Sequence, residues 1–174
     1  MKPATLRAEL RSDQSQTMRN RRTIATLALG AAVPLGYIAL WQMGVVRRIA
    51  DPDLPLLDAE KVNGSDQAYA RFDVPDAFLG VASLAATATL AATGGTRRSP
   101  LLAMAMAMAA KIGFDAANAA KLTVDQWTKY RAFCMWCLLS AGATFAMVPL
   151  ALHEVKQALR MLRGSPLAQS RSGR

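Results

Sequence analysis

The chain has 174 residues, of which 52% are hydrophobic and 19% are charged, and its formal net charge is +9. The basic residues concentrate in segments beside long apolar runs, as membrane insertion requires, so the positive charge does not indicate a nucleic-acid-binding protein. Two cysteines and one histidine are too few ligands for a thiolate metal site, and no metal is expected.

Four apolar runs predict four membrane-spanning helices: 23–46, 77–93, 101–120 and 132–152. The first run has no charge over 24 residues and the last has none over 21. About 20 residues suffice to cross a bilayer. The second run is short, at 17 residues, and the third contains only Lys111 and Asp115 as charged residues. We therefore expect an all-α protein, an integral membrane four-helix bundle.

Basic residues give the expected orientation. They precede the first run, occur as Arg97 and Arg98 after the second, and follow the fourth, whereas the connection 47–76 has seven acidic and four basic residues. Under the positive-inside rule both termini and the Arg97–Arg98 turn are cytoplasmic, and the connection lies outside. The expected units are a loosely ordered basic cytoplasmic tail, a four-span membrane domain and a second basic cytoplasmic tail: 1–22, 23–155 and 156–174.

The outer connection contains one predicted helix. Ser65 is in the position of an N-cap for a short helix that runs through Phe72, with Ala68, Tyr69 and Phe72 on its apolar side. Two interpretations stay open at this point. The helix is either a lid across the outer mouth of the bundle or an interfacial helix with aromatic anchors.

The two cysteines, Cys134 and Cys137, form a Cys-X-X-Cys pair at the start of the fourth run. This spacing places both sulfurs on one face of a helix, close enough for a reversible disulfide. The helix dipole and the nearby Lys129 and Arg131 should lower the pKa of a thiol there. We expect Cys134, the shallower residue, to meet a soluble partner, and Cys137 to face the bundle and its lipid side. The alternative is an inert pair kept for packing.

The third run carries a polar stripe, with Lys111, Asp115, Asn118 and Lys121 at spacings of 4, 3 and 3 residues. Charged residues within a membrane usually face the bundle interior or a cavity. One interpretation is a polar wall at Asp115 and Asn118 that supplies protons or binds a ligand carbonyl. The other is a neutralised Lys111–Asp115 pair that only fixes helix packing.

A four-span bundle whose last span opens with Cys-X-X-Cys resembles the vitamin K epoxide reductase family. The match runs from about Thr23 to Val155 and includes four short motifs of the outer connection and the span after it: Asn63-Gly64-Ser65, Tyr69-Ala70, Val74-Pro75 and Leu79-Gly80. The resemblance implies a membrane quinone, either ubiquinone or menaquinone, bound within the bundle near its outer face. It also implies that Cys134 and Cys137 cycle between dithiol and disulfide, with Cys137 beside the quinone, and that Asn63 and Ser65 help to cover it.

The sequence departs from the family pattern in the outer connection, where 47–76 lacks the second cysteine pair that relatives use to shuttle electrons. A fused thioredoxin-like domain is also absent, and the tyrosine that some members place four residues after the second cysteine is Ala141. We therefore expect a separate thioredoxin-like dithiol protein to supply electrons on the outer, periplasmic side of a bacterial inner membrane. The rival interpretations are a non-catalytic membrane protein of the same fold with a structural or assembly role, and a small transporter.

Overall fold

Helices make up most of the chain in the computed structural model, which describes residues 3–70, 72–93 and 101–163. Their bounds are α1 Pro3–Ser12, α2 Gln16–Gln42, α3 Ala59–Asn63, α4 Asp66–Tyr69, α5 Asp76–Thr93, α6 Leu101–Asp125, the π-helical turn η1 Gln126–Tyr130, and α7 Met135–Arg163. Within the described ranges there is no strand, and β-type pairing is limited to one isolated bridge between Leu57 and Phe133. The prediction of an all-α protein is confirmed.

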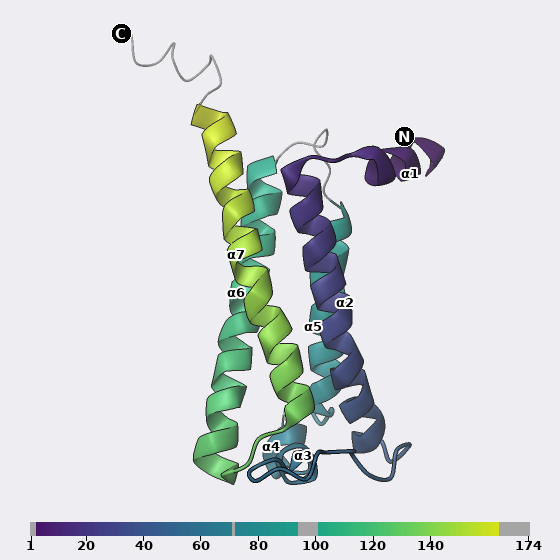
Figure 1. The fold of residues 1–174 in the computed structure, drawn as a ribbon, viewed down its shortest axis with the longest axis vertical. Coiled ribbons are helices and arrows are strands. Elements are labelled where there is room, and N and C mark those ends of the chain that lie inside the picture. Colours follow the sequence, from purple (N-terminus) through teal and green to yellow (C-terminus); the bar gives the residue numbers. More distant parts are fainter. Residues whose placement is uncertain (1–2, 71, 94–100, 164–174) are drawn as a thin grey trace.

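The four long helices α2, α5, α6 and α7 run side by side, as Figure 1 shows. Helix α1 lies across one end of them, here called the α1 end, and α3 and α4 lie at the other, here called the loop end. Helix α2 packs along α5 and α7, and α6 packs along α7, whereas α5 and α6 touch each other much less. The weakly packed pair therefore leaves room inside the bundle.

Three of the four long helices are long and apolar enough to cross a membrane, namely α2, α5 and the part of α7 from Met135 to Met161. Helix α6 has 25 residues and packs along α7 like the others, but its polar stripe includes Lys111 and Asp115. These two charges lower its mean hydropathy. The fourth span and the cytoplasmic placement of the termini thus remain predictions.

The N-terminal segment is more ordered than predicted. Helix α1 occupies most of it, and α2 begins at Gln16, where the Ser15 hydroxyl accepts a hydrogen bond from the N–H of Met18. The Arg22 guanidinium donates to two carbonyl oxygens, those of Leu10 and Asp13, and so ties α1 to α2. The prediction of a loosely ordered segment before residue 23 is therefore wrong for the described part of it.

Other helix ends also differ from the predicted spans. Helix α2 stops at Gln42 instead of residue 46, because the chain turns at Gly44, whose φ is +76°. Helix α7 starts at Met135 instead of residue 132 and continues to Arg163, into the predicted C-terminal tail. The Arg97–Arg98 turn and residues 164–174 lie outside the described residues.

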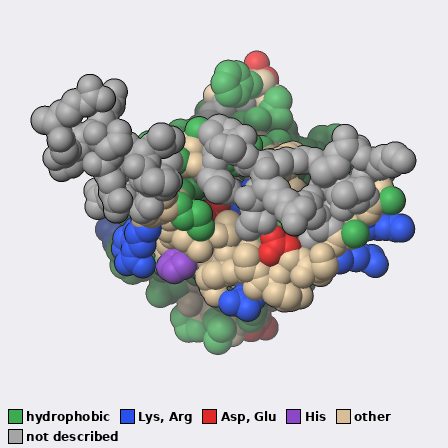
Figure 2. Space-filling model, turned by 90° about the horizontal axis from the view of Figure 1, so that it is seen from above, with side chains coloured by type: hydrophobic (Ala, Val, Ile, Leu, Met, Phe, Trp, Pro, Cys, Tyr) green, Lys and Arg blue, Asp and Glu red, His purple; other side chains and the backbone are tan. Residues whose placement is uncertain are grey.

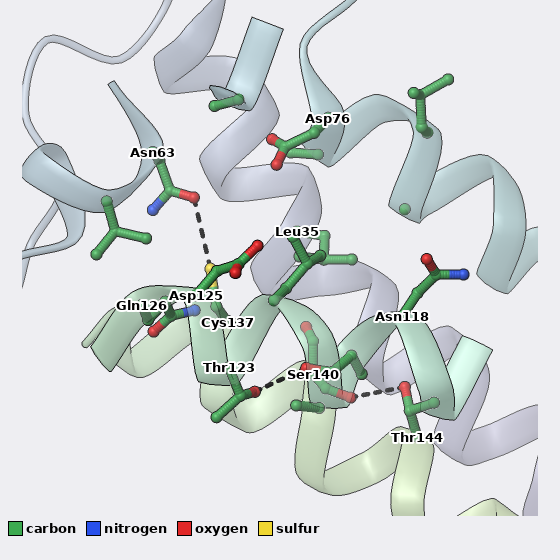
Figure 3. Close-up of a pocket in the computed structure, with 18 of the residues that line it drawn as sticks. Leu35, Asn63, Asp76, Asn118, Thr123, Asp125, Gln126, Cys137, Ser140 and Thr144 are labelled. Carbon is green, nitrogen blue, oxygen red and sulfur yellow. Dashed lines mark hydrogen bonds between the residues drawn. The ribbon is translucent and has the colours of Figure 1, made fainter. Parts of the chain in front are cut away.

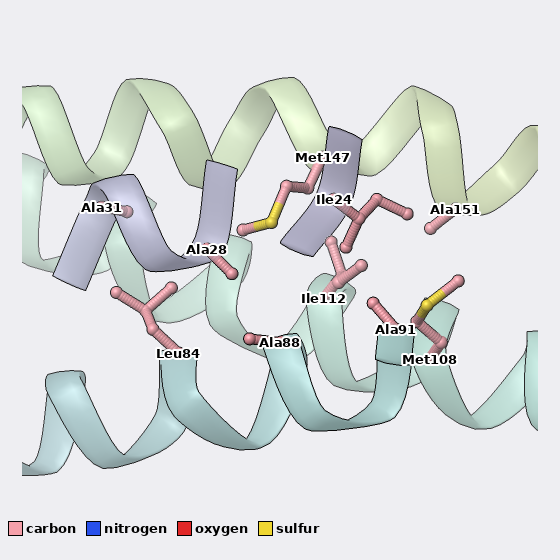
Figure 4. Packing of buried hydrophobic residues seen from close by; sticks show 10 residues of the cluster. All are labelled: Ile24, Ala28, Ala31, Leu84, Ala88, Ala91, Met108, Ile112, Met147 and Ala151. Atoms are coloured by element: carbon pink, nitrogen blue, oxygen red, sulfur yellow. The ribbon is translucent and has the colours of Figure 1, made fainter. Parts of the chain in front are cut away.

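The main apolar core lies between the four long helices toward the α1 end (Figure 4). Ile24, Met108, Ile112 and Met147 are fully buried in it, and they interdigitate with alanines from α2, α5 and α7. Small residues allow helix backbones to approach closely in lipid, where van der Waals packing drives association. This core fills the α1 half of the bundle.

A polar ladder joins α2 to α7 at the α1 end. Arg21 forms an ion pair with Glu154, and both side chains are buried. Asn20 contacts His153 at 3.2 Å, and the Thr17 hydroxyl donates to Gln157 at 2.9 Å. Figure 2 looks onto this end, where basic side chains (blue) and the histidine (purple) lie around the rim. Arg21 was assigned to the basic tail, but it is a structural residue within the bundle.

Candidate functional site

Cys134 occupies the N-cap of α7, directly before the first helical residue. Its carbonyl oxygen accepts the first helical hydrogen bond, from the N–H of Leu138 at 3.0 Å, and its sulfur accepts from the N–H of Cys137 at 3.2 Å. The Cys-X-X-Cys spacing is therefore the spacing from an N-cap to the third helical residue. Both thiols are free. The prediction placed both cysteines on a helix, which is correct for Cys137 only, because α7 begins at Met135.

Cys134 is 0% exposed, although it was predicted to be the residue that meets a soluble partner. It belongs to a buried apolar cluster that also contains Ile38 of α2 and three residues of the segment 49–62, namely Ile49, Ala59 and Val62. Two backbone hydrogen bonds to Phe133 hold this covering segment in place. The N–H of Phe133 donates to the carbonyl of Leu56 at 2.7 Å, and the carbonyl of Phe133 accepts from the N–H of Asp58 at 3.0 Å. That prediction is wrong for this conformation, because the connection 47–76 folds back over the sulfur.

The pKa of the Cys134 thiol lies below its ordinary value. The main cause is a hydrogen bond from the Cys137 thiol, to which the Cys137 N–H and Asn63 add, while burial acts in the opposite direction. Lys129 and Arg131 were expected to cause this shift. Instead, Lys129 donates to Gln67 at 2.7 Å, and Arg131 lies over the ring of Trp127 at 5.1 Å from its centroid. The direction was predicted correctly, but the cause is different.

Cys137 lies on the wall of a cavity of about 280 Å³ at the loop end. Helices α5, α6 and α7 form its walls, Leu35 of α2 lines its back, and α4 with the residues before it forms its roof. Figure 3 shows Asn63 above Cys137, whose sulfur lies 3.5 Å from the Asn63 Oδ1. Asn63 is fixed in place by its own hydrogen bond to the carbonyl of Ala59 at 2.8 Å. The cavity therefore presents one sulfur and one amide toward the loop end.

Ser65 also lines the cavity, and it is the N-cap residue of α4, as predicted. It precedes α4, yet its hydroxyl donates to the carbonyl of Val62 at 3.0 Å and makes no side-chain cap bond. The helix ends at Tyr69, not at Phe72, whose φ is +59° and whose side chain is 86% exposed. Because Ser65 and Ala68 line the cavity, the helix forms a roof, as in the lid interpretation.

The polar stripe of α6 reaches the same cavity from below. Asp115 and Asn118 line it, whereas Lys121 does not and forms an ion pair with Asp125, one turn further along α6, at 2.7 Å. The Asp115 carboxylate accepts from Lys111 at 2.6 Å and from the hydroxyl of Ser83 on α5 at 2.7 Å. The structure thus combines both interpretations, because the charged pair joins α5 to α6 and also borders the cavity.

Comparison with protein families places this geometry in a known context. The model of the vitamin K epoxide reductase family matches residues 22–152, three quarters of the chain. The chain belongs to this family. Vitamin K epoxide reductase family membership suggests a membrane thiol–disulfide oxidoreductase linked to a quinone. Comparisons with curated proteins and with solved structures found no match.

The cavity fits the quinone that the vitamin K epoxide reductase family suggests. Its volume is near the lower end of the roughly 300–1,000 Å³ typical of small-molecule sites, which suits a single ring system. Leucines and a phenylalanine supply apolar walls, among them Leu79 and Phe114. Polar groups border both ends, with Asn63 and Cys137 at one and Asp115 at the other. A quinone supplies a pair of carbonyl oxygens that accept two electrons and two protons.

Several residues of this site were not predicted from the sequence. Ser83 and Thr87 on α5 contact the charged pair of α6, and their spacing of four residues in an apolar run was a usable signal. Gln126, which accepts from the N–H of Cys134 at 2.9 Å, comes from a π-helical turn that no motif marks. Helix α3 was also missed, although Asp58 is a recognisable N-cap.

Proposed function

We propose that this protein is a four-span, quinone-linked thiol–disulfide oxidoreductase of a bacterial inner membrane, with its active site on the periplasmic side. Electrons from an external dithiol pass through Cys134 and Cys137 to a membrane quinone, ubiquinone or menaquinone, in the cavity. The observation that carries this proposal is the position of Cys137, whose thiol lies on the cavity wall one helical turn from a second thiol.

The two sulfurs have different surroundings, which support different roles. Cys134 is the better thiolate, because the N–H and thiol of Cys137 donate to its sulfur. It therefore attacks the sulfur of Cys137 when the disulfide between the two cysteines forms. Cys137 reaches the cavity and delivers electrons there. Asn63 orients the Cys137 thiol, and together with Ser65, Asp115 and Asn118 it borders the quinone site.

The electron donor must come from outside the membrane domain. The connection 47–76 contains no cysteine, so within this sequence nothing passes electrons to Cys134 and Cys137. A separate thioredoxin-like dithiol protein is the donor that fits, through a mixed disulfide. Because Cys134 is buried beneath the segment 49–62, the donor binds only when this covering segment moves.

The direct test is thiol-driven quinone reduction by the purified protein, followed by quinone absorbance with dithiothreitol as donor. Cys134→Ala and Cys137→Ala should each lower the rate at least 100-fold, while Met135→Leu, between the two cysteines, should leave it within twofold. A full rate in Cys137→Ala disproves the mechanism. Thiols that stay unreactive toward quinone and dithiothreitol in the intact protein support the non-catalytic structural role.

Orientation can be tested independently of activity. In a cysteine-free background, Phe72→Cys introduces one thiol at an exposed position of the loop end. A membrane-impermeant maleimide should label this thiol in intact spheroplasts without permeabilisation. Labelling that requires permeabilisation would place the loop end in the cytoplasm and overturn the periplasmic assignment.

A further inference from the structure

A continuous hydrogen-bonded network crosses from α6 to α5 beneath the cavity. The Lys111 ammonium donates to Asp115 at 2.6 Å, to the hydroxyls of Ser83 and Thr87 at 2.8 and 3.3 Å, and to the Ser83 carbonyl at 3.1 Å. The carboxylate in turn contacts both hydroxyls, at 2.7 and 3.1 Å. Each hydroxyl thus lies within hydrogen-bonding distance of both the ammonium and the carboxylate, so a proton can move between them.

The network is open to the cavity on one side. Ser83 and Asp115 both line the cavity, which also contains Cys137. The other titratable residues on this wall are Asp76, Asp125 and Tyr130, which lie toward the loop end of the same helices or in the turn η1. A ligand bound against Cys137 therefore has the Asp115 carboxylate at the opposite end of its site.

On the side of the α1 end, the network meets the apolar core. Met108 lies one turn before Lys111, toward the α1 end of α6, and Ile112 is the residue next to Lys111. Met147 faces them from α7, and all three apolar side chains are 0% exposed (Figure 4). The next buried polar groups of the described chain in that direction belong to the Arg21–Glu154 ladder, beyond this core. Among the described residues no buried polar side chain lies between the two, so this part of the chain offers the network a proton route toward the cavity and none through the core.

Packing alone accounts poorly for a charged pair at this position. Inserting one Lys or Asp at the centre of a membrane helix costs roughly 2.5–3.5 kcal/mol, and such residues commonly mark proton or substrate pathways. Apolar residues of similar volume often stabilise a buried site as well as an ion pair does. The pair also lies where a reducible ligand needs protons.

We propose that Asp115, held by Lys111 and Ser83, is the proton-transfer residue for the quinone oxygen that lies away from Cys137, and that protons reach it only from the loop end. This inference rests on the proposed function. When the sulfur–sulfur bond forms, the two S–H bonds of Cys134 and Cys137 break, two electrons leave the pair, and two O–H bonds form on the quinone. Both protons are released and taken up on one side, so turnover moves no net charge across the membrane.

Substitutions of the carboxylate test the assignment of Asp115. Asp115→Asn should lower kcat about 100-fold, which is the scale of general-acid catalysis. The KM for quinone should stay within threefold, and the rate should fall tenfold per pH unit, because solvent then supplies the proton. Asp115→Glu should restore much of the rate. The matched control is the Arg21→Gln/Glu154→Gln double variant, which removes the buried ion pair at the α1 end and should keep the wild-type pH profile.

The reduction of the Cys134–Cys137 disulfide by dithiothreitol, measured without quinone, separates the two proposals. It should be unchanged in Asp115→Asn. An unchanged pH profile in this variant, with cysteine-dependent quinone reduction intact, refutes the role of Asp115 and leaves the proposed function standing. Loss of cysteine dependence in the wild type refutes the proposed function itself.

Proteoliposomes test the direction of proton uptake. A membrane-impermeant phosphine reductant added outside selects the molecules whose loop end faces outward. The rate of quinone reduction should be the same with and without a potassium diffusion potential, and a pH dye trapped in the lumen should record no alkalinisation. Alkalinisation of the lumen, or a rate that follows the potential, would show protons crossing the bundle and overturn the inference.

Discussion

Replacing Cys134 by serine and by alanine separates its structural role from its chemical role. Both changes remove the thiol, so both abolish electron transfer in the proposed mechanism. Only alanine removes the acceptor that receives the N–H of Cys137 at 3.2 Å. Serine keeps an acceptor of the same geometry, and its oxygen accepts hydrogen bonds better than sulfur does. The two inactive variants should therefore differ in stability.

The size of the difference follows from the cap. Loss of an N-cap side chain costs about 0.5–2 kcal/mol. The other hydrogen bonds of Cys134 are made by its own backbone N–H, to Gln126, and its carbonyl, from Leu138, and both variants retain them. We therefore expect Cys134→Ala to unfold about 1 kcal/mol more easily than Cys134→Ser. For a chain of this size, 1 kcal/mol corresponds to roughly 2–4 °C in Tm.

The assay is thermal unfolding of the detergent-solubilised variants, with reductant present so that no disulfide contributes. The Cys137→Ser and Cys137→Ala pair provides the control, because the Cys137 sulfur is not the acceptor of a backbone N–H and its two variants should differ less. Equal Tm values for Cys134→Ser and Cys134→Ala, or a higher value for alanine, would refute the capping role.

Three further outcomes are expected. Gly64→Ala brings a methyl group within 2.8 Å of a backbone carbonyl oxygen of α3 and should lower the free energy of unfolding by about 1–3 kcal/mol. The control is Gly36→Ala, whose methyl group meets nothing within 4 Å, and equal Tm values for the two variants would contradict this packing. Cys137→Ala removes the thiol that donates to Cys134, so the pKa of Cys134 should rise and its alkylation by iodoacetamide should require a higher pH. An unchanged or lower midpoint pH of alkylation would exclude that hydrogen bond as the cause of the lowered pKa. Arg21→Met leaves the buried carboxylate of Glu154 unpaired and should lower the free energy of unfolding by about 3–5 kcal/mol. Adding Glu154→Gln should restore part of this stability, and no recovery would show that the broken ion pair is not the source of the loss.

The long helices could be predicted from the sequence because length and hydropathy determine them almost alone. Their ends could not, since Ser15 begins α2 within a polar segment and Gly44 ends it within an apolar one. Hydropathy also does not show which charged residues form buried ion pairs. Arg21 has the composition of a tail residue, but its partner Glu154 lies 133 positions away, and only the packing of α2 on α7 brings them together.

The candidate site was predictable where spacing within one helix decides it. The cysteine pair and the stripe through Asp115 both follow from residue separations in the sequence. The proximity of Asn63 to Cys137 was expected from the family resemblance, not from any local pattern. The burial of Cys134 could not be foreseen, because it depends on how the outer segment folds back and pairs with Phe133.

Because the covering segment lies over Cys134, access to this sulfur depends on the fraction of molecules in which the segment is open. If the segment is open for one molecule in about a hundred, every exchange at Cys134 is about a hundred times slower than its intrinsic rate. A donor that binds the open form recovers that factor through its own binding energy, whereas a small thiol in solution has no such energy to use. The segment that hides the sulfur would then favour electrons from a docked protein over electrons from the surrounding pool of small thiols, which react about a hundred times more slowly.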